Sequence, residues 1–415
     1  MEPRNLKRVL IHSIVFSPDG VSTAYLYNDI ALGLVDNGFD VVVLTTTPHY
    51  NLIESELEKQ PLSKKLFGLY YVSYFNGIRV YHIPLKKYKS TSKRIISFVY
   101  WHLASLILGL TLKKINFILS PSPPLSIGFI SFLISKIKGA KAIYNVQEIY
   151  PDLLINQGSL NSSLIINLLK KFEKFIYNNS DAVVTIDNVF YSTILPRFRD
   201  SRKLHIIPNF VDTDLYMPLK TQQILPSIFG EKNGKIKILY AGNIGFFQDW
   251  GPVLFAAKEL LDENIEFWII GEGVQKEFLE KEVQDLNLTN VRIFPYQSRE
   301  LIPIINNYAD IHFIAINQQM EQEGFPSKVY TIMACAKPLV VVTGEKTPLF
   351  NFLKGNNCAE IVTSDRNLNF TNSIRKLANN KALREEMGIN GYNEIIKNYS
   401  KKVVVSRYAN LLNSL

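Results

Sequence analysis

The sequence predicts an α/β protein of two domains, each organised around a doubly wound parallel sheet. Short apolar or β-branched runs alternate with helical patterns through both halves of the chain, which is typical of parallel sheets with helices on both faces. The length of 415 residues suggests more than one core, and the hydrophobic share of 47% suffices to fill two. We expect domains over residues 1–208 and 209–395, and a C-terminal helix over 396–415 that can cross back.

The composition of the chain limits the kinds of site and partner that it can have. Only two cysteines occur, which excludes a disulfide framework and a cysteine-based zinc site. The net charge of +9 and the pI of 9.2 favour an anionic partner. Nucleic acid is not favoured, because no basic stripe interleaved with aromatics occurs outside one apolar helix. The N-terminus shows no signal-peptide pattern, so a location inside the cell is expected.

The chain opens with a predicted βαβ unit. The strand Val9–Phe16 leads through SPDG to a helix over Thr23–Asp36 and a strand over Val41–Thr45. The loop after the first strand faces the carboxyl edge of a parallel sheet. Its small residues therefore either contact a ligand or form a capped turn; they are Gly20, Ser22 and Thr23.

A membrane-like segment follows. Pro48–Phe67 is predicted to be a mobile loop, and Tyr70–Tyr74 with Ile78–Ile83 a hairpin. The apolar run Ile95–Leu112 then lies between basic flanks, which favours a helix that packs partly on the sheet and partly touches anionic lipid. A plain core helix and a membrane span are the alternatives.

Polar residues follow the next predicted strand, Ala142–Val146. Gln147, Glu148 and Asp152 come at its carboxyl end, where open α/β sheets bind ligands. His49 follows the earlier strand in the same way, although it is also explained as an ordinary loop histidine. Asp212 and Asp214 form a D-x-D arrangement, but their place before a polar linker favours a turn over a metal site.

The second half repeats the alternation of strand and helix. Its strands are predicted over Ile236–Tyr240, Glu266–Ile270, Val291–Phe294 and Ile311–Ala315. Glycines follow several of them, so the loops are expected to converge on one edge of the sheet; these glycines are Gly242, Gly271 and Gly324.

The segment Glu321–Gly344 combines the most features of a ligand-binding loop. Gly324 lets the backbone approach a ligand, Pro326 and Ser327 are types that open a helix, and Lys328 lies in the first turn. A helix start with a lysine suits a diphosphate. Glu323 beside it would then serve uncharged sugar hydroxyls. The alternative is an ordinary loop and helix with both charges solvated.

Eight short motifs occur in order along nearly the whole chain. They are FSPDGVSTAYLYNDIALGLVDNGFDVVVLTT, SPSPP, NVQEIYPDLLINQG, IPNFVDTDLYMP, LYAGNIG, IIGEGVQKEFLE, VRIFP and FPSKVYTIMACAKPLVV. Together they resemble the retaining glycosyltransferases of the GT-B fold in glycosyltransferase family 4. The nearest branch includes the colanic-acid and O-antigen fucose and N-acetylfucosamine transferases. The resemblance implies two Rossmann-like domains that face a cleft.

The resemblance also implies roles for single residues. Glu323 takes the first position of the family's E-x7-E motif, and Thr331 stands where the second glutamate is usual. The family's Arg and Lys pair after the first strand of the second domain is absent, since the loop carries Asn243 and other uncharged or acidic residues. The diphosphate would therefore depend on Lys328. The expected donor site comprises Gly242, Asn243, Gly271, Glu272, Gly273, Pro295, Tyr296, Gly324, Phe325, Pro326, Ser327 and Thr331.

The implied activity is metal-independent transfer of a sugar, with retention, from a UDP- or GDP-linked donor and without a further cofactor. Glu323 and Lys328 are the expected donor-side catalytic residues, and Glu148, Asp152 and His49 are candidates for accepting the acceptor's proton. Gly20, Ser22, Thr23 and Gln147 are expected on the acceptor side. The expected acceptor is a polyprenyl-diphosphate-linked glycan at the inner leaflet, in O-antigen or capsule synthesis. A nucleotide-sugar 2-epimerase and a catalytically silent scaffold subunit are the alternatives.

Overall fold

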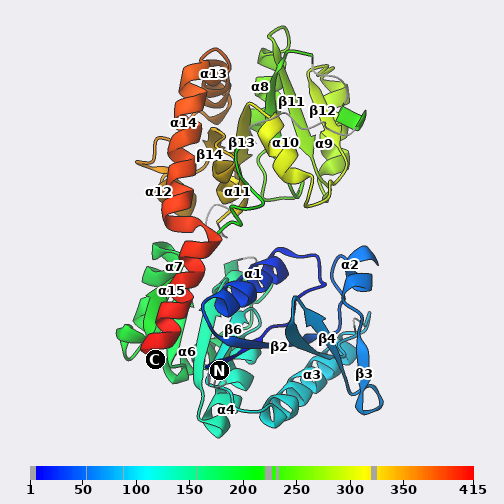
Figure 1. The fold of residues 1–415 in the computed structure, drawn as a ribbon. Helices are drawn as coiled ribbons and strands as arrows, with labels where there is room; N and C mark the ends of the chain where they lie inside the picture. Colours follow the sequence, from blue (N-terminus) through cyan, green and yellow to red (C-terminus); the bar gives the residue numbers. More distant parts are fainter. Residues whose placement is uncertain are drawn as a thin grey trace. The chain divides into compact units, whose positions relative to one another are not determined.

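The protein folds as two compact units, each with its own sheet (Figure 1). The computed structural model describes residues 6–52, 54–86, 88–156, 158–219, 227–229, 233–318 and 325–415. Unit 1 comprises Met1–Asn209 with Lys401–Leu415, and unit 2 comprises Phe210–Ser400. The chain therefore passes between the units twice.

Unit 1 is built on a nine-stranded sheet. Most neighbours are parallel, whereas the edge strands β3, β4 and β5 form an antiparallel meander. In spatial order the strands are β3 (Ser63–Lys65), β4 (Tyr70–Phe75), β5 (Ile78–Ile83), β2 (Asp40–Thr46), β1 (Arg8–His12), β6 (Phe117–Ser122), β7 (Lys141–Val146), β8 (Ala182–Thr185) and β9 (Leu204–Ile206).

Helices cover both faces of this sheet. On one face, the C-terminal helix packs so closely on the first helix that a Cβ at Gly33 would lie 2.7 Å from Val405. On the other face, four helices share a core with Trp101 and Tyr144. The helices of unit 1 are α1 (Ser22–Asp36), α2 (Glu54–Lys59), α3 (Thr91–Thr111), α4 (Leu125–Lys138), α5 (Asp152–Asn156), α6 (Ser163–Asn179), α7 (Asn188–Ile194) and α15 (Lys401–Ser414).

Unit 2 contains a six-stranded parallel sheet, in agreement with the predicted alternation. Its strands, in spatial order, are β12 (Val291–Phe294), β11 (Ile265–Ile270), β10 (Ile236–Ala241), β13 (Ile311–Ala315), β14 (Leu339–Val342) and β15 (Ala359–Val362). Its helices are α8 (Gly251–Glu259), α9 (Lys276–Asp285), α10 (Ile302–Tyr308), α11 (Lys328–Ala334), α12 (Pro348–Leu353), α13 (Arg366–Ala378) and α14 (Lys381–Glu394).

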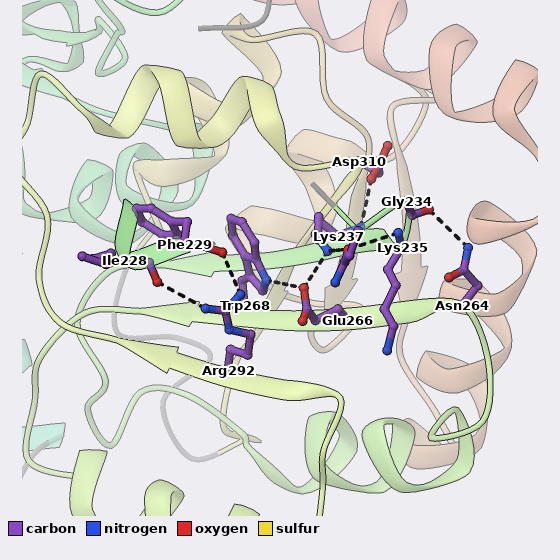
Figure 2. Close-up of polar contacts among 11 residues, drawn as sticks. Ile228, Phe229, Gly234, Lys235, Lys237, Asn264, Glu266, Trp268, Arg292 and Asp310 are labelled. Atoms are coloured by element: carbon purple, nitrogen blue, oxygen red, sulfur yellow. Dashed lines mark hydrogen bonds and ion pairs between the residues drawn. The ribbon is translucent and has the colours of Figure 1, made fainter. Parts of the chain in front are cut away.

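A buried ion pair fastens the amino-terminal ends of the central strands of unit 2 (Figure 2). Lys237 Nζ lies 2.6 Å from Glu266 Oε2, and Trp268 Nε1 donates to the same oxygen at 2.8 Å. Burial would raise the pKa of Glu266, but hydrogen bonds from Lys237 and Trp268 hold it below its ordinary value. Ligands of parallel sheets bind at the opposite, carboxyl edge, so this cluster stabilises the fold.

The same cluster holds a short segment that precedes β10. Phe229 stacks on Trp268 with ring centroids 5.2 Å apart, and Arg292 donates to the carbonyl oxygen of Phe229 at 2.7 Å. Phe229 is buried in a core patch together with Phe294. The segment is thus anchored on the sheet by packing and by hydrogen bonds (Figure 2).

Two predictions of local structure were wrong. The segment Pro48–Phe67, expected to be a mobile loop, contains α2 and β3. The strand β3 was not predicted because it is polar. Its conformation comes from pairing with β4, a tertiary contact that leaves no periodic pattern in the sequence. The final helix, expected over 396–415, begins at Lys401 after the helical turn Ile395–Tyr399.

Candidate functional site

Two glycine loops lie together at the carboxyl edge of the unit 2 sheet. Gly242 follows β10 and donates its N–H to the carbonyl oxygen of Ile270 at 2.9 Å, while Ile244 donates to that of Glu272 at 2.9 Å. A Cβ at Gly271 would lie 1.9 Å from the carbonyl oxygen of Gly242, so a side chain cannot be accommodated there. The predicted convergence of these two loops is confirmed.

Lys328 extends from the start of α11 to the Gly242 loop. Its Nζ lies 3.7 Å from the centroid of the Tyr240 ring and would lie 2.6 Å from a Cβ at Gly242. The Tyr240 hydroxyl in turn donates to the carbonyl oxygen of Asn243 at 2.6 Å. Two segments that are distant in sequence, the end of β10 with its loop and the start of α11, therefore meet around one ammonium group.

Burial of that ammonium group lowers the pKa of Lys328 to about 7. Removing a cation from water disfavours its charged form, and an arriving anion would restore the charge. The protonation of a lysine with such a lowered pKa would therefore change strongly when a phosphate binds beside it. The geometry thus places the Lys328 amine against the Gly242 loop, in space that a side chain at Gly242 would fill.

The other predicted donor-side residues have mixed environments. Phe325 stacks on Tyr330 at 5.1 Å and meets the edge of Phe352 at 5.2 Å, so its ring belongs to the core. The Thr331 hydroxyl donates to the carbonyl oxygen of Lys328 at 2.9 Å. Pro326 and Ser327 come directly before α11. Glu323 and Gly324 lie outside the described residues.

The second glycine loop continues toward β12. A Cβ at Gly273 would lie 2.2 Å from the carbonyl oxygen of Ile244, so this position also requires glycine. Glu272 pairs with Lys276 at 2.7 Å. Hydrogen bonding to Lys276, helped by a backbone N–H of Tyr296, lowers the pKa of Glu272. Pro295 and Tyr296 follow β12 and are exposed.

In unit 1, a buried carboxylate joins the loops after β1 and β2. Asp19 accepts the N–H groups of His49 and Tyr50, both at 2.7 Å, and Gly20 donates to the carbonyl oxygen of Tyr50 at 3.0 Å. Burial raises the pKa of Asp19. His49 Nδ1 lies 2.9 Å from the carbonyl oxygen of Thr47. The sequence alone did not indicate Asp19, because SPDG predicts only a turn.

The two carboxylates predicted for the acceptor side differ in their surroundings. Asp152 is paired with Arg197, which also holds the buried Glu173 at 2.5 Å. Glu148 lies in a half-buried position after β7, and burial raises its pKa. A carboxyl group whose pKa is raised by burial is the better proton acceptor, so Glu148 suits this role more than Asp152 does.

Gln147 has a structural contact of its own. Its Nε2 donates to Asn145 at 3.1 Å and its Oε1 accepts from Asn209 at 2.9 Å, close to the first passage between the units. Asn145 also donates to the hydroxyl of Tyr408 in α15 at 2.8 Å. Ser22 and Thr23, at the start of α1, are exposed.

Comparison with known families identifies both halves of the chain. Residues 24–215 match the family described as Glycosyltransferase Family 4, and residues 222–394 match the family described as Glycosyl transferases group 1. This chain carries two glycosyltransferase domains. Their junction falls close to the division between the two units.

One curated relative and two solved structures resemble the whole two-domain glycosyltransferase chain. WcaI of Escherichia coli K12, named for glycosyl transfer in colanic acid biosynthesis, is 25% identical over 82% of this chain and 84% of its own. HepE of Anabaena, in complex with UDP, has a TM-score of 0.72 at 12% identity and covers 99% of this chain and 100% of its own. Sucrose-phosphate synthase of Thermosynechococcus elongatus has a TM-score of 0.71 at 14% identity, with 98% of each chain covered. The predicted GT-B fold is confirmed.

The acidic residues and histidines of the described chain do not gather into a metal site. Over the described residues, no group of three or more His, Cys, Asp or Glu side chains could hold a metal ion. Asp212 accepts the N–H of Asp214 at 3.0 Å through its carboxylate and that of Tyr216 at 2.9 Å through its carbonyl oxygen. These contacts form the turn that the sequence predicted at this point.

The first glycosyltransferase domain has an apolar outer helix. Within the described part of the chain, α3 is long and apolar enough to cross a membrane, by length and composition only. Its Trp101, His102, Ser105 and Gly109 are buried. Its exposed side chains include the polar ones of the first turn and six large hydrophobic ones: Ile95, Ile96, Val99, Tyr100, Leu103 and Ile107.

Proposed function

We propose that the protein is a retaining, metal-independent glycosyltransferase that uses a nucleotide-diphosphate sugar. The observation that carries the proposal is the buried Lys328 ammonium group beside the Gly242 loop. A cation placed where the diphosphate leaves stabilises the transition state, and one such contact contributes on the order of 3 kcal/mol. That UDP is bound by a protein of the same fold supports the choice of a nucleotide donor.

The acceptor we propose is a polyprenyl-diphosphate-linked glycan at the inner leaflet, in the synthesis of a surface polysaccharide such as O-antigen or capsule. The exposed apolar residues of α3, flanked by lysines, support a peripheral seat on anionic lipid. The name of WcaI supports polysaccharide synthesis. The family branch favours N-acetylfucosamine or a related deoxy sugar as the group transferred.

The roles of Lys328, Glu148 and His49 follow from their surroundings, and that of Glu323 follows from the family resemblance. Lys328 neutralises the diphosphate, Glu323 holds sugar hydroxyls, and Glu148 takes the proton of the acceptor hydroxyl. His49, held by the Asp19 loop contact, orients the acceptor. Lys328→Ala should reduce turnover far more than it changes folding. Unchanged turnover would remove Lys328 from this assignment.

Thermal unfolding with a panel of nucleotide sugars tests the donor, because a ligand that binds only the folded state raises its stability. Calorimetry with UDP and GDP separates the proposal from a silent scaffold, which Thr331 and the absence of an Arg and Lys pair from the Asn243 loop favour. A scaffold would bind neither nucleotide. A 2-epimerase would form product from donor alone, whereas the proposed transferase requires the acceptor.

A further inference from the structure

The β3–β4 hairpin lies at the edge of the unit 1 sheet (Figure 1). Its tip carries an unusual set of side chains. Leu66 and Leu69 are 62% and 58% exposed, and Phe67 is 101% exposed. We call these three residues the hairpin knuckle. Large apolar side chains cluster on a soluble surface chiefly where another apolar phase covers them.

The backbone of the knuckle makes its sequence more informative. Leu66 and Phe67 have φ of 42° and 57°, and Gly68 follows at 97°. Hairpin turns of this conformation favour asparagine and glycine, because a Cβ is disfavoured at positive φ. The turn is closed by a hydrogen bond of 3.1 Å from the Leu69 N–H to the carbonyl oxygen of Leu66. Large apolar residues therefore occupy positions that disfavour them twice, because the side chains are exposed to water and the backbone has positive φ.

The positive charge around the knuckle indicates that its partner is anionic. Residues 59–147 contain 14 lysines and arginines and no aspartate or glutamate. Lys64 and Lys65 directly precede the knuckle and are exposed. An apolar tip with adjacent lysines complements an anionic bilayer, in which phosphates attract the cations and acyl chains accept the ring.

The residue that follows the knuckle packs on the side of the sheet that carries α3. Tyr70 packs with Tyr81 against the core that contains Trp101 of α3. Unit 1 thus offers two separate exposed apolar surfaces, one along a helix and one at a hairpin tip.

We propose that the hairpin knuckle is a second membrane anchor, which inserts Phe67 into an anionic bilayer while α3 lies along its surface. The proposal rests on the membrane seat included in the proposed function. Two anchors on one rigid sheet fix the orientation of the domain on the membrane, because a single helix could still rotate about its axis.

The experiment compares full-length variants on vesicles of phosphatidylglycerol and phosphatidylcholine in equal parts, and on phosphatidylcholine alone. Phe67→Ser should weaken binding to the anionic vesicles by about tenfold or more, as expected for one buried phenylalanine. Phe278→Ser removes an exposed phenylalanine of unit 2 and is the matched control, with binding unchanged. Circular dichroism verifies that both variants are folded.

A fluorescent variant reports insertion directly. The native tryptophans are buried, so Phe67→Trp adds an exposed one, whose emission should shift to the blue and be quenched by brominated acyl chains. Equal vesicle binding by wild type and Phe67→Ser would overturn the proposal. An absence of vesicle binding by the wild type would also overturn it. So would a blue shift that appears without vesicles when the protein concentration is raised, because a second copy of the chain would then be the partner.

Nucleotide binding is measured on the same Phe67→Ser sample. Retained UDP or GDP binding with lost vesicle binding supports both the anchor and the proposed function. Lost vesicle binding in a protein that binds neither nucleotide supports the anchor and contradicts the donor assignment. The two failures are therefore distinguishable.

Discussion

Lys328 combines a positive charge with a site that disfavours it. The ammonium group is withdrawn from water over the Tyr240 ring, and this burial lowers its pKa from 10.5 to about 7. In the unfolded chain the lysine keeps its ordinary pKa. The folded state therefore carries a cost at neutral pH that an anionic ligand would relieve.

The cost can be measured as a pH-dependent difference in stability. Between about pH 7 and 10.5 the unfolded chain binds more protons at this residue, so the free energy of unfolding rises with pH. Lys328→Met keeps the bulk of the side chain and removes the charge. We expect its denaturation midpoint to exceed that of the wild type at pH 7 and below, and the difference to vanish toward pH 10. A constant difference across this range would contradict the assigned pKa.

Nucleotide binding should be coupled to the same proton. At pH 8 most of the Lys328 groups are neutral, and a diphosphate raises the pKa again, so UDP binding takes up a proton. Affinity should fall as pH rises above 7. Isothermal titration in two buffers of different ionisation enthalpy measures the uptake, and Lys328→Met should abolish it. Binding without proton uptake would place the diphosphate away from Lys328.

At the scale of the elements, α3 buries small and polar residues and exposes several large apolar ones. Its His102, Ser105 and Gly109 face the core beside Trp101, and a Cβ at Gly109 would lie 2.6 Å from Ile134. Other apolar residues of the helix are exposed. Close helix packing explains the inner face, and contact with an apolar phase would explain the exposed apolar residues.

The outer face of α3 can be removed without disturbing its inner face. Ile96→Ser, Val99→Ser and Leu103→Ser in one variant should reduce flotation with anionic vesicles by at least tenfold, since each side chain loses its transfer into lipid. The melting temperature should change little because all three are exposed. Ile389→Ser, an exposed isoleucine of α14, is the control. Unaltered flotation of the triple variant would show that α3 makes no lipid contact.

Elements with a strong local pattern were predictable, and pairings between distant segments were not. The strand β14 follows from an unbroken run of four apolar residues, and the meeting of the Gly242 and Gly271 loops follows from parallel topology. The pairing of Asp152 with Arg197 joins residues 45 positions apart and leaves no periodic trace. Likewise, β3 is polar and owes its conformation to β4.

At the scale of the molecule, the C-terminal helix belongs to the domain in which the chain begins. Six residues of α15 are buried in unit 1, including Val404, Val405 and Tyr408. The Tyr408 hydroxyl accepts a hydrogen bond of 2.8 Å from the buried Asn145. Tyr408→Phe should lower stability by about 1–3 kcal/mol, because it leaves a buried amide donor unsatisfied. Denaturant unfolding measures this loss, and unchanged stability would mean that water replaces the hydroxyl.

The division into two units predicts two calorimetric transitions that respond differently to ligand. If the nucleotide contacts the Gly242 loop of unit 2, UDP at about 100 times its dissociation constant adds about 2.7 kcal/mol to that unit and raises its transition by roughly 5–10 °C. The transition of unit 1 should move less. A chain that ends at Ser400 lacks α15, which is part of unit 1. It should therefore lose the transition of unit 1 and keep the transition of unit 2, which UDP raises. If the truncation removed the UDP-sensitive transition instead, the nucleotide would have to be reassigned to the domain that α15 completes.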